Sequence, residues 1–165
     1  MRHVAGLTLI ELLVAVSVFA IMATTGLPAM ASFIASQHQL ATKDALLEAL
    51  RSARDEAQRR STPIRLCPTA NGTSCGSNWN QGWLIFIDKN NDGQFTAQDQ
   101  RLKQKLNSQA AAISTTASSL LFRANGMTAQ TQFTICTDNT QANAYQISVT
   151  STGRVFAQEK SGVCS

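Results

Sequence analysis

The sequence has few of the residues that carry catalysis. Its only histidines are His3 and His38, so residues 39–165 contain none of the commonest general base in enzymes. The chain also has no G-x-S-x-G motif and no glycine-rich loop of the kind that binds phosphates. Its aspartates at 88, 92 and 99 are grouped in one predicted turn, where they cannot face each other across a cleft. These absences argue against an enzyme, and no cofactor is expected.

Aromatic and charged residues are also scarce. Aromatic residues make up 6% of the 165 residues and charged residues 15%, and the formal net charge is only +4. Serine, threonine, asparagine and glutamine are abundant, which is typical of a small extracytoplasmic domain with a thin hydrophobic core. The chain is long enough for one modest domain of this kind but not for two. Its mild positive charge favours acidic partners weakly.

One long segment has no charged residue at all. Between Glu11 and Lys43 there is none, and residues 12–34 are long and apolar enough to cross a bilayer core of about 30 Å as a helix. Arg2 lies among the six residues that precede the apolar segment, so the positive-inside rule predicts a cytoplasmic N-terminus and an external C-terminal domain. A cleaved secretory signal is not expected, because the apolar segment is too long and no convincing A-x-A site follows it. An uncleaved signal anchor is the alternative.

Glu11 is the unusual residue of this segment. It lies among leucine and isoleucine residues, where burying a carboxylate in a membrane costs about 2.5 to 3.5 kcal/mol on insertion scales. A carboxylate in this position needs a partner. The alternative is a tolerated interfacial carboxylate near the end of the span.

The N-terminal motif carries a family resemblance. The leader that ends in Gly6, followed by L-T-L-I-E-L-L, resembles the class III leader of type IV pilins and of the pseudopilins of type II secretion. In that family the prepilin peptidase cleaves after the glycine and methylates the new amino terminus, which implies N-methylated Leu7 here, where phenylalanine is usual. Glu11 matches the family's glutamate, and Pro28 its helix-kinking proline. The resemblance implies that the amine of Leu7 in one subunit neutralises Glu11 of its neighbour, a pair that sets register more than it adds affinity.

The helix is predicted to continue beyond the apolar segment, with a kink at Pro28. Apolar residues recur at helical spacing from Leu40 to Ala57, with charged residues between them, and Pro63 ends the pattern. The sequence thus divides into a cleaved leader 1–6, a transmembrane and assembly helix 7–34, an amphipathic half-helix 35–61 and a β-rich extracytoplasmic domain 62–165. The fold class is α+β: the resemblance implies a pilin-like fold, a long kinked helix packed on a mainly antiparallel β-sheet.

The β-rich part contains several predicted strands. The strongest covers residues 82–88, is apolar on both faces and is expected to be central. The segment 101–106 alternates basic residues with leucine and is expected to form a sheet edge with one positive face. Shorter or weaker strands are predicted at residues 63–67, 119–123, 132–137, 145–150 and 154–157. The last two are joined by a tight turn, Ser151-Thr152-Gly153.

Four cysteines, Cys67, Cys75, Cys136 and Cys164, lie beyond the predicted span. An oxidising compartment would pair them, and four cysteines allow three connectivities. We favour Cys67 with Cys75, which closes a short loop, and Cys136 with Cys164, which fixes the C-terminus. A zinc site is the competing interpretation, but the sequence has no C-x-x-C pair and no histidine near these cysteines.

Residues 88–99 imitate a calcium loop. The candidate oxygen ligands are Asp88, Asn90, Asp92, the carbonyl of Gln94, and Asp99 at the twelfth position, with Gly93 at the sharp turn. The loop departs from the calcium pattern because aspartate replaces the usual bidentate glutamate and a strand, not a helix, precedes it. Asn-Asp-Gly is also simply a good turn between two strands. We favour the turn, and no metal is expected.

A second resemblance narrows the family. Leu66-Cys67-Pro68, Cys75, the segment W-N-Q-G-W-L-I-F at 79–86 and the D-x-N-x-D-G turn that follows are similar to the GspH-domain group. That group includes the minor pilins FimU and FimT and the minor pseudopilin H of type II secretion. It implies a minor pilin or pseudopilin that assembles with other subunits, is processed by the prepilin peptidase, and moves from the bacterial inner membrane, with its domain in the periplasm, to a filament tip. We favour a FimU-like role in priming a type IV pilus, with pseudopilin H as an alternative.

A further alternative is DNA binding for uptake, in which cationic residues engage phosphates in a salt-dependent way. The candidate contacts are Arg101, Lys103, Lys105 and Arg154. Some FimT proteins have a C-terminal G-R-x-R element associated with DNA capture. Gly153 and Arg154 match it, but Phe156 takes the place of the second arginine, which argues for the FimU-like role. The competing interpretation of the basic strand is an edge whose lysine and arginine residues discourage aggregation.

Overall fold

The computed structural model describes residues 8–106, 111–137, 144–162 and 164, without the side chains of residues 23 and 25–29. It divides the chain into two compact units, Met1–Ser36 and Gln37–Ser165, which are treated separately below. Gly6 and Leu7 lie outside the described residues. The four parts predicted from the sequence remain a prediction.

A single helix, α1 (Leu9–Arg60), supplies the described residues of the first unit and continues into the second. Thr8 begins it, because the carbonyl of Thr8 accepts hydrogen bonds from the N–H groups of Glu11 (3.1 Å) and Leu12 (3.2 Å). The helix is assigned without interruption through residue 28, and the predicted kink at Pro28 remains a prediction. It ends at Arg60, and the φ of 50° at Ser61 breaks the helical geometry.

Within the described part of the chain, no helix is both long and apolar enough to cross a membrane. The span predicted at residues 7–34 includes Leu7 and six positions whose side chains lie outside the described set. The membrane span therefore remains a prediction.

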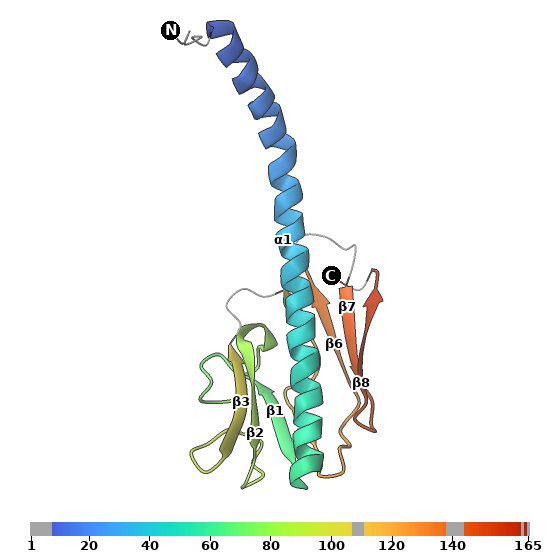
Figure 1. Ribbon diagram of the computed structural model, residues 1–165. Helices are drawn as coiled ribbons and strands as arrows, with labels where there is room; N and C mark the ends of the chain where they lie inside the picture. The colour runs from blue at the N-terminus through green and yellow to red at the C-terminus, as the bar shows by residue number, and fades with distance from the viewer. Residues whose placement is uncertain (1–7, 107–110, 138–143, 163, 165) are drawn as a thin grey trace, which may run out of the picture. The chain divides into compact units, whose positions relative to one another are not determined.

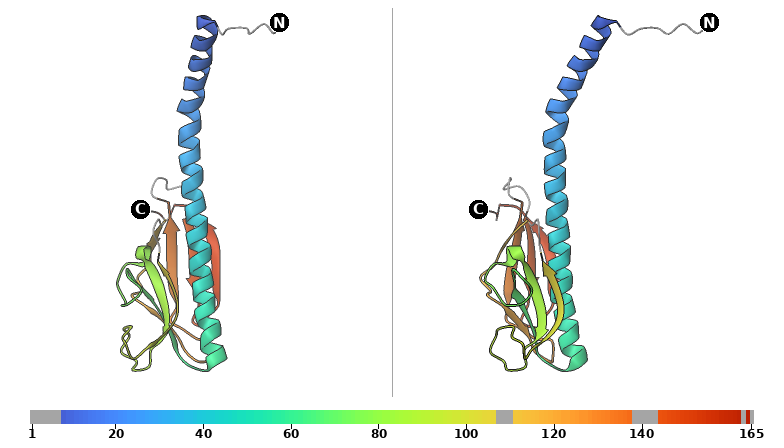
Figure 2. Two further views of the ribbon diagram at one scale, coloured as in Figure 1. Left: turned by 60° about the vertical axis from the view of Figure 1, so that its left-hand side comes forward. Right: turned by 90° about the vertical axis from the view of Figure 1, so that its left-hand side faces the viewer.

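The second unit contains two four-stranded antiparallel sheets. The first has the order β3-β2-β1-β5 and the second the order β4-β6-β7-β8. In Figures 1 and 2 both sheets lie on the same side of the second half of α1. This arrangement confirms the predicted α+β fold, with two sheets in place of one. The strands are β1 (Ile64–Pro68), β2 (Gly82–Ile87), β3 (Gln100–Leu106), β4 (Ala112–Ser114), β5 (Leu120–Phe122), β6 (Thr131–Cys136), β7 (Ala144–Val149) and β8 (Val155–Lys160), with a 3-10 helix η1 (Trp79–Gln81) before β2.

The core lies between α1 and the two sheets. Leu46, Leu50, Ala53 and Ala57 of α1 are fully buried against apolar side chains of both sheets. Their i, i+4, i+7 and i+11 spacing places them on one face of the helix, as the sequence predicts. Gln39, also buried, donates a hydrogen bond of 2.9 Å to the carbonyl of Ile135 and so connects the helix to β6.

Strand β2 is central, as predicted, because it lies between β1 and β3. Trp83 and Ile85 belong to the core that faces α1, whereas Leu84 and Phe86 form a second small cluster with Cys67 on the opposite face of the sheet. The run of apolar residues in this strand is therefore explained by burial on both faces.

The structure of strand β3 differs from the predicted sheet edge with one positive face. The register pairs Ile85 with Lys103 and Phe86 with Arg101, so that Leu102 is an extra residue in a β-bulge. The bulge reverses the alternation, and Arg101 points to the opposite face from Lys103 and Lys105. The prediction of a single positive face on this strand is wrong, since a bulge cannot be inferred from alternation alone.

Candidate functional site

The first described turn of α1 contains Glu11. Its side chain is exposed and, among the described residues, it forms no salt bridge. The large apolar side chains around it are exposed as well, for example Leu9 at 77% and Leu13 at 55%. This carboxylate, which has no salt-bridge partner in the described part of the chain, is thus surrounded by exposed apolar side chains.

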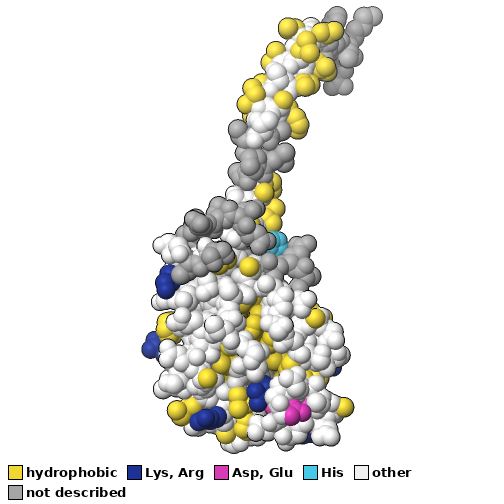
Figure 3. All heavy atoms as spheres, turned by 180° about the vertical axis from the view of Figure 1, so that it is seen from behind, with side chains coloured by type: hydrophobic (Ala, Val, Ile, Leu, Met, Phe, Trp, Pro, Cys, Tyr) yellow, Lys and Arg dark blue, Asp and Glu magenta, His cyan; other side chains and the backbone are white. Residues whose placement is uncertain are grey.

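Exposed apolar side chains continue along the first unit, where Figure 3 shows them in yellow. Contiguous exposed apolar side chains of this kind mark a site of contact with lipid or with other apolar helices. The exposed large residues of this segment are Leu9, Ile10, Leu12, Leu13, Val14, Val16, Val18, Phe19, Ile21, Met22, Met30, Phe33 and Ile34.

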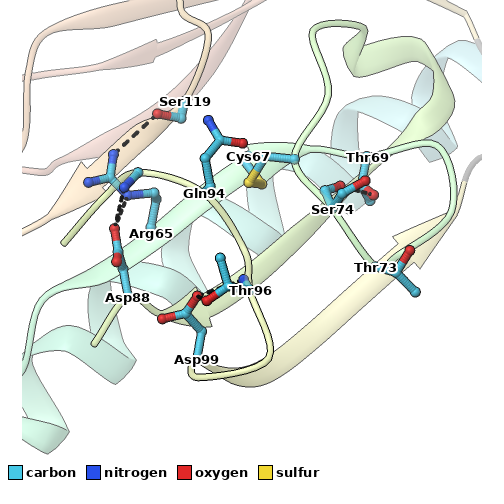
Figure 4. Close-up of a disulfide and its surroundings, with 12 residues drawn as sticks. Arg65, Cys67, Thr69, Thr73, Ser74, Asp88, Gln94, Thr96, Asp99 and Ser119 are labelled. Carbon is cyan, nitrogen blue, oxygen red and sulfur yellow. Dashed lines mark hydrogen bonds and ion pairs between the residues drawn. A yellow bond between two sulfur atoms is a disulfide. The ribbon is translucent and has the colours of Figure 1, made fainter. Parts of the chain in front are cut away.

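Two disulfides brace the second unit. Cys67 bonds to Cys75 and Cys136 to Cys164, which are the two pairs favoured from the sequence. The first closes a loop that Thr69 organises: its Oγ1 donates to the carbonyl of Ser74 (2.7 Å) and accepts from the N–H of Gly72 (2.9 Å). Figure 4 shows this loop beside the disulfide. The second disulfide fixes the segment after β8 to the end of β6.

The calcium-like turn is stabilised by its own hydrogen bonds. Asp99 Oδ2 accepts from the N–H (2.7 Å) and Oγ1 (2.8 Å) of Thr96, and Asp99 Oδ1 accepts from the N–H of Lys89 (2.9 Å). Burial alone would raise the pKa of the Asp99 carboxyl, but these hydrogen bonds outweigh it, and the pKa is lowered. Asn90 Nδ2 donates to Asp92 Oδ2 at 2.7 Å, and the N–H of Gln94 donates to Asp92 Oδ1 at 2.7 Å.

Arg65 forms an ion pair with Asp88, one of the candidate calcium ligands. Its Nε lies 2.9 Å from Asp88 Oδ2, which also accepts the N–H of Gly93 at 2.9 Å (Figure 4). Among the described residues no group of three or more His, Cys, Asp or Glu side chains is arranged to hold a metal ion. The side chains of Asp88, Asn90, Asp92 and Asp99 form hydrogen bonds within the turn, and the preference for a turn over a calcium site stays a prediction. The sequence analysis missed Arg65, although a lone charge in the short apolar strand I-R-L-C is a usable signal for a buried partner.

The four cationic residues proposed for DNA do not form one surface. Arg101 donates to the carbonyl of Gly72 (3.1 Å) and to Gln104 Oε1 (2.8 Å), away from Lys103 and Lys105. Arg154 lies in the other sheet region, at the turn before β8, with its guanidinium 5.7 Å from the ring centroid of Phe156.

The glycine at position 153 is required by the geometry of its turn. Its φ is 77°, and a Cβ there would collide with the carbonyl of Gly126, so only glycine fits this turn. The match of Gly153 to a DNA-binding element is therefore explained without DNA.

Comparison with known protein families identifies the family of this chain. The family described as type II transport protein GspH matches residues 43–153, from the second half of α1 to the turn before β8. The chain belongs to the GspH family. The prokaryotic N-terminal methylation motif matches residues 1–27, which include Gly6, Leu7 and Glu11. No curated protein matches the sequence.

Solved structures share the fold of this GspH-family chain. The type IV minor pilin FimU of Pseudomonas aeruginosa PAO1 superposes with a TM-score of 0.62 at 20% identity, over 76% of this chain and 92% of FimU. The minor pseudopilin EpsH of the Vibrio cholerae type 2 secretion system gives a TM-score of 0.51 at 9% identity, over 73% of this chain and 95% of EpsH. The GspH-family chain is thus a pilin-like structural subunit, a minor pilin or minor pseudopilin, and not an enzyme.

Proposed function

We propose that this GspH-family chain is made as a precursor, cleaved by the prepilin peptidase between Gly6 and Leu7, and N-methylated at Leu7. The methylation motif at residues 1–27 supports this processing. The first half of α1 would then hold the subunit in the inner membrane, with the second unit in the periplasm, until it enters a filament. The exposed apolar surface of residues 9–34 supports this step, because lipid and neighbouring helices are the two environments that stabilise it.

The main support for the assembly proposal is the position of Glu11, a carboxylate within an apolar surface. Cleavage creates an amine four residues before Glu11, and an extended row of apolar side chains separates this carboxylate from water once helices pack together. An unpaired buried charge is strongly unfavourable, whereas a paired one roughly breaks even. The pair between the Leu7 amine of one subunit and Glu11 of the next would therefore fix the axial register of the filament.

We favour a role at the tip of a type IV pilus, where the chain joins other minor subunits in a priming complex. The support is the FimU-like sequence pattern, in which Phe156 replaces the second arginine of the FimT-type element. Pseudopilin H of a type II secretion system is the alternative, since processing and helix are common to both machines. DNA binding is disfavoured for two reasons. The candidate cations are divided between the regions of two sheets, and the guanidinium of Arg101 already donates hydrogen bonds to Gly72 and Gln104.

Mass spectrometry of the protein from its native membrane tests the processing. We expect a mature N-terminus at Leu7 that is heavier by one methyl group, and an intact start at Met1 or a terminus elsewhere would overturn the proposal. Deletion of the chain in a host with both machines, scored for pilus number and for secreted enzymes, distinguishes the pilus from the secretion system.

A further inference from the structure

Strand β3 is the outermost strand of its sheet (Figure 1). Among the strands that the structure describes it pairs only with β2, so the other side of its backbone has no strand partner there. All of its residues except Leu102 are exposed, including the apolar Leu106 at 48%. A seven-residue exposed edge of this kind is a ready template for pairing with another strand.

A groove runs beside this edge, within the second unit. It has a volume of about 190 Å³ and lies between α1 and β3. Ala45, Ala49 and Ser52 form its helix side, and their i, i+4, i+7 spacing brings three small side chains to face the strand. Trp83 and Ile85 of β2 form its floor. The small helix residues explain the groove, because larger side chains at these positions would fill it.

The strand side of the groove is cationic. Lys103 and Lys105 line it, and the register places both on the same face as Ile85 and Trp83. Neither lysine forms a salt bridge with any residue that the structure describes. Glu48 of α1 also lines the groove, so its charged side chains are two lysines and one glutamate. The two lysines, 2 residues apart in an extended strand, match acidic side chains at the same alternation in a partner strand.

We propose that β3 is the docking edge for an extended, acidic segment of another protein chain. The segment pairs with the open edge of β3 and places alternate carboxylates beside Lys103 and Lys105, on the face of the sheet where the groove lies. Backbone pairing supplies affinity and the side-chain positions supply selectivity, as in other cases of strand addition. The site requires neither leader cleavage nor a membrane span, so it goes beyond the proposed function.

Peptide binding to the full chain in detergent micelles tests the site. The probe is a ten-residue peptide of alternating glutamate and valine, with a lysine–valine peptide of the same length as its charge control. We expect the acidic peptide to bind and to slow hydrogen exchange of the β3 amides. The lysine–valine peptide should do neither. The double variant K103E/K105E should weaken binding by about tenfold or more, because two charge pairs become repulsive. The matched control K160E, on β8, should leave binding unchanged.

Two further measurements separate strand pairing from charge attraction. An acidic peptide with N-methyl groups on alternate backbone nitrogens retains its charges but cannot pair, and it should not bind. Equal binding of this peptide or of the lysine peptide, unchanged binding to K103E/K105E, or absence of β3 protection would each overturn the proposal. Displacement of the acidic peptide by a single-stranded oligonucleotide would also overturn it and assign the two lysines to nucleic acid. Circular dichroism and intact disulfides establish that each variant is folded.

Discussion

Arg65 and Asp88 form a salt bridge with 2.9 Å between Nε and Oδ2, and the Asp88 side chain is only 1% exposed. The pair connects β1 to the end of β2. Asp88 also accepts the N–H of Gly93, and Arg65 donates to Ser119 Oγ at 3.3 Å. A single buried ion pair thus joins two strands, the turn after β2 and the segment before β5.

Breaking this pair from the arginine side should destabilise the fold. Arg65→Met leaves a buried carboxylate without its counter-ion, and we expect a loss of about 3 kcal/mol in the free energy of unfolding. Asp88→Asn retains an acceptor for the N–H of Gly93. In this background Arg65→Met should lower the free energy of unfolding by a clearly smaller amount. Urea unfolding of the four proteins in this cycle measures the coupling. Equal costs in both backgrounds would show that the pair is not coupled, and Arg123→Met serves as an exposed control.

Asp99 should make stability depend on pH in the acidic range. Hydrogen bonds from Thr96 and Lys89 lower its pKa in the folded state despite burial. The stabilisation is therefore present above the unfolded pKa of about 3.9 and is lost as pH falls through the lower folded value. The difference in the free energy of unfolding between the wild type and Asp99→Asn should be constant near pH 7 and should shrink below about pH 4. In an NMR titration, Thr96→Val should raise the pKa of Asp99, and an unchanged value would contradict this assignment.

The two disulfides should differ in their contributions to stability. Loop-closure entropy predicts about 3.6 kcal/mol for Cys136–Cys164 and about 2.5 kcal/mol for Cys67–Cys75, because their sequence separations are 28 and 8. Paired alanine substitutions, compared by urea unfolding of the full chain in detergent, measure both losses. A larger loss for the shorter loop would show that local packing around Thr69 outweighs chain entropy.

DNA should not bind the chain appreciably at physiological salt. A gel shift with the full chain in detergent is expected to show no retarded band in 150 mM salt, since affinity for phosphates requires several clustered cations. A band that weakens steeply with salt and disappears in Arg154→Ala would contradict this expectation and favour an uptake role. The control is Arg123→Ala, which removes an exposed cation outside the candidate set.

Local patterns in the sequence are sufficient for much of this fold. The second half of α1 follows from Leu46, Leu50 and Ala57 at helical spacing, and β2 from its unbroken apolar run. Long-range features could not be predicted in the same way. The bulge at Leu102 depends on pairing with β2, and the Arg65–Asp88 pair joins residues 23 apart in sequence. The short strand β4 has three residues and no periodic signal, because its place is set by pairing with β6.

Glu11→Ala should block incorporation of the subunit into filaments without preventing membrane insertion or cleavage after Gly6. The substitution removes the carboxylate that would neutralise the Leu7 amine of a neighbour, so the amine is left as an unpaired charge among apolar helices. Glu11→Gln should fail equally, because it retains the shape but not the charge. Sheared filament fractions, compared with membrane fractions by mass spectrometry, measure incorporation, and Asp55→Ala on the same helix is the matched control. Wild-type levels of Glu11→Ala in filaments would show that register is set elsewhere along α1.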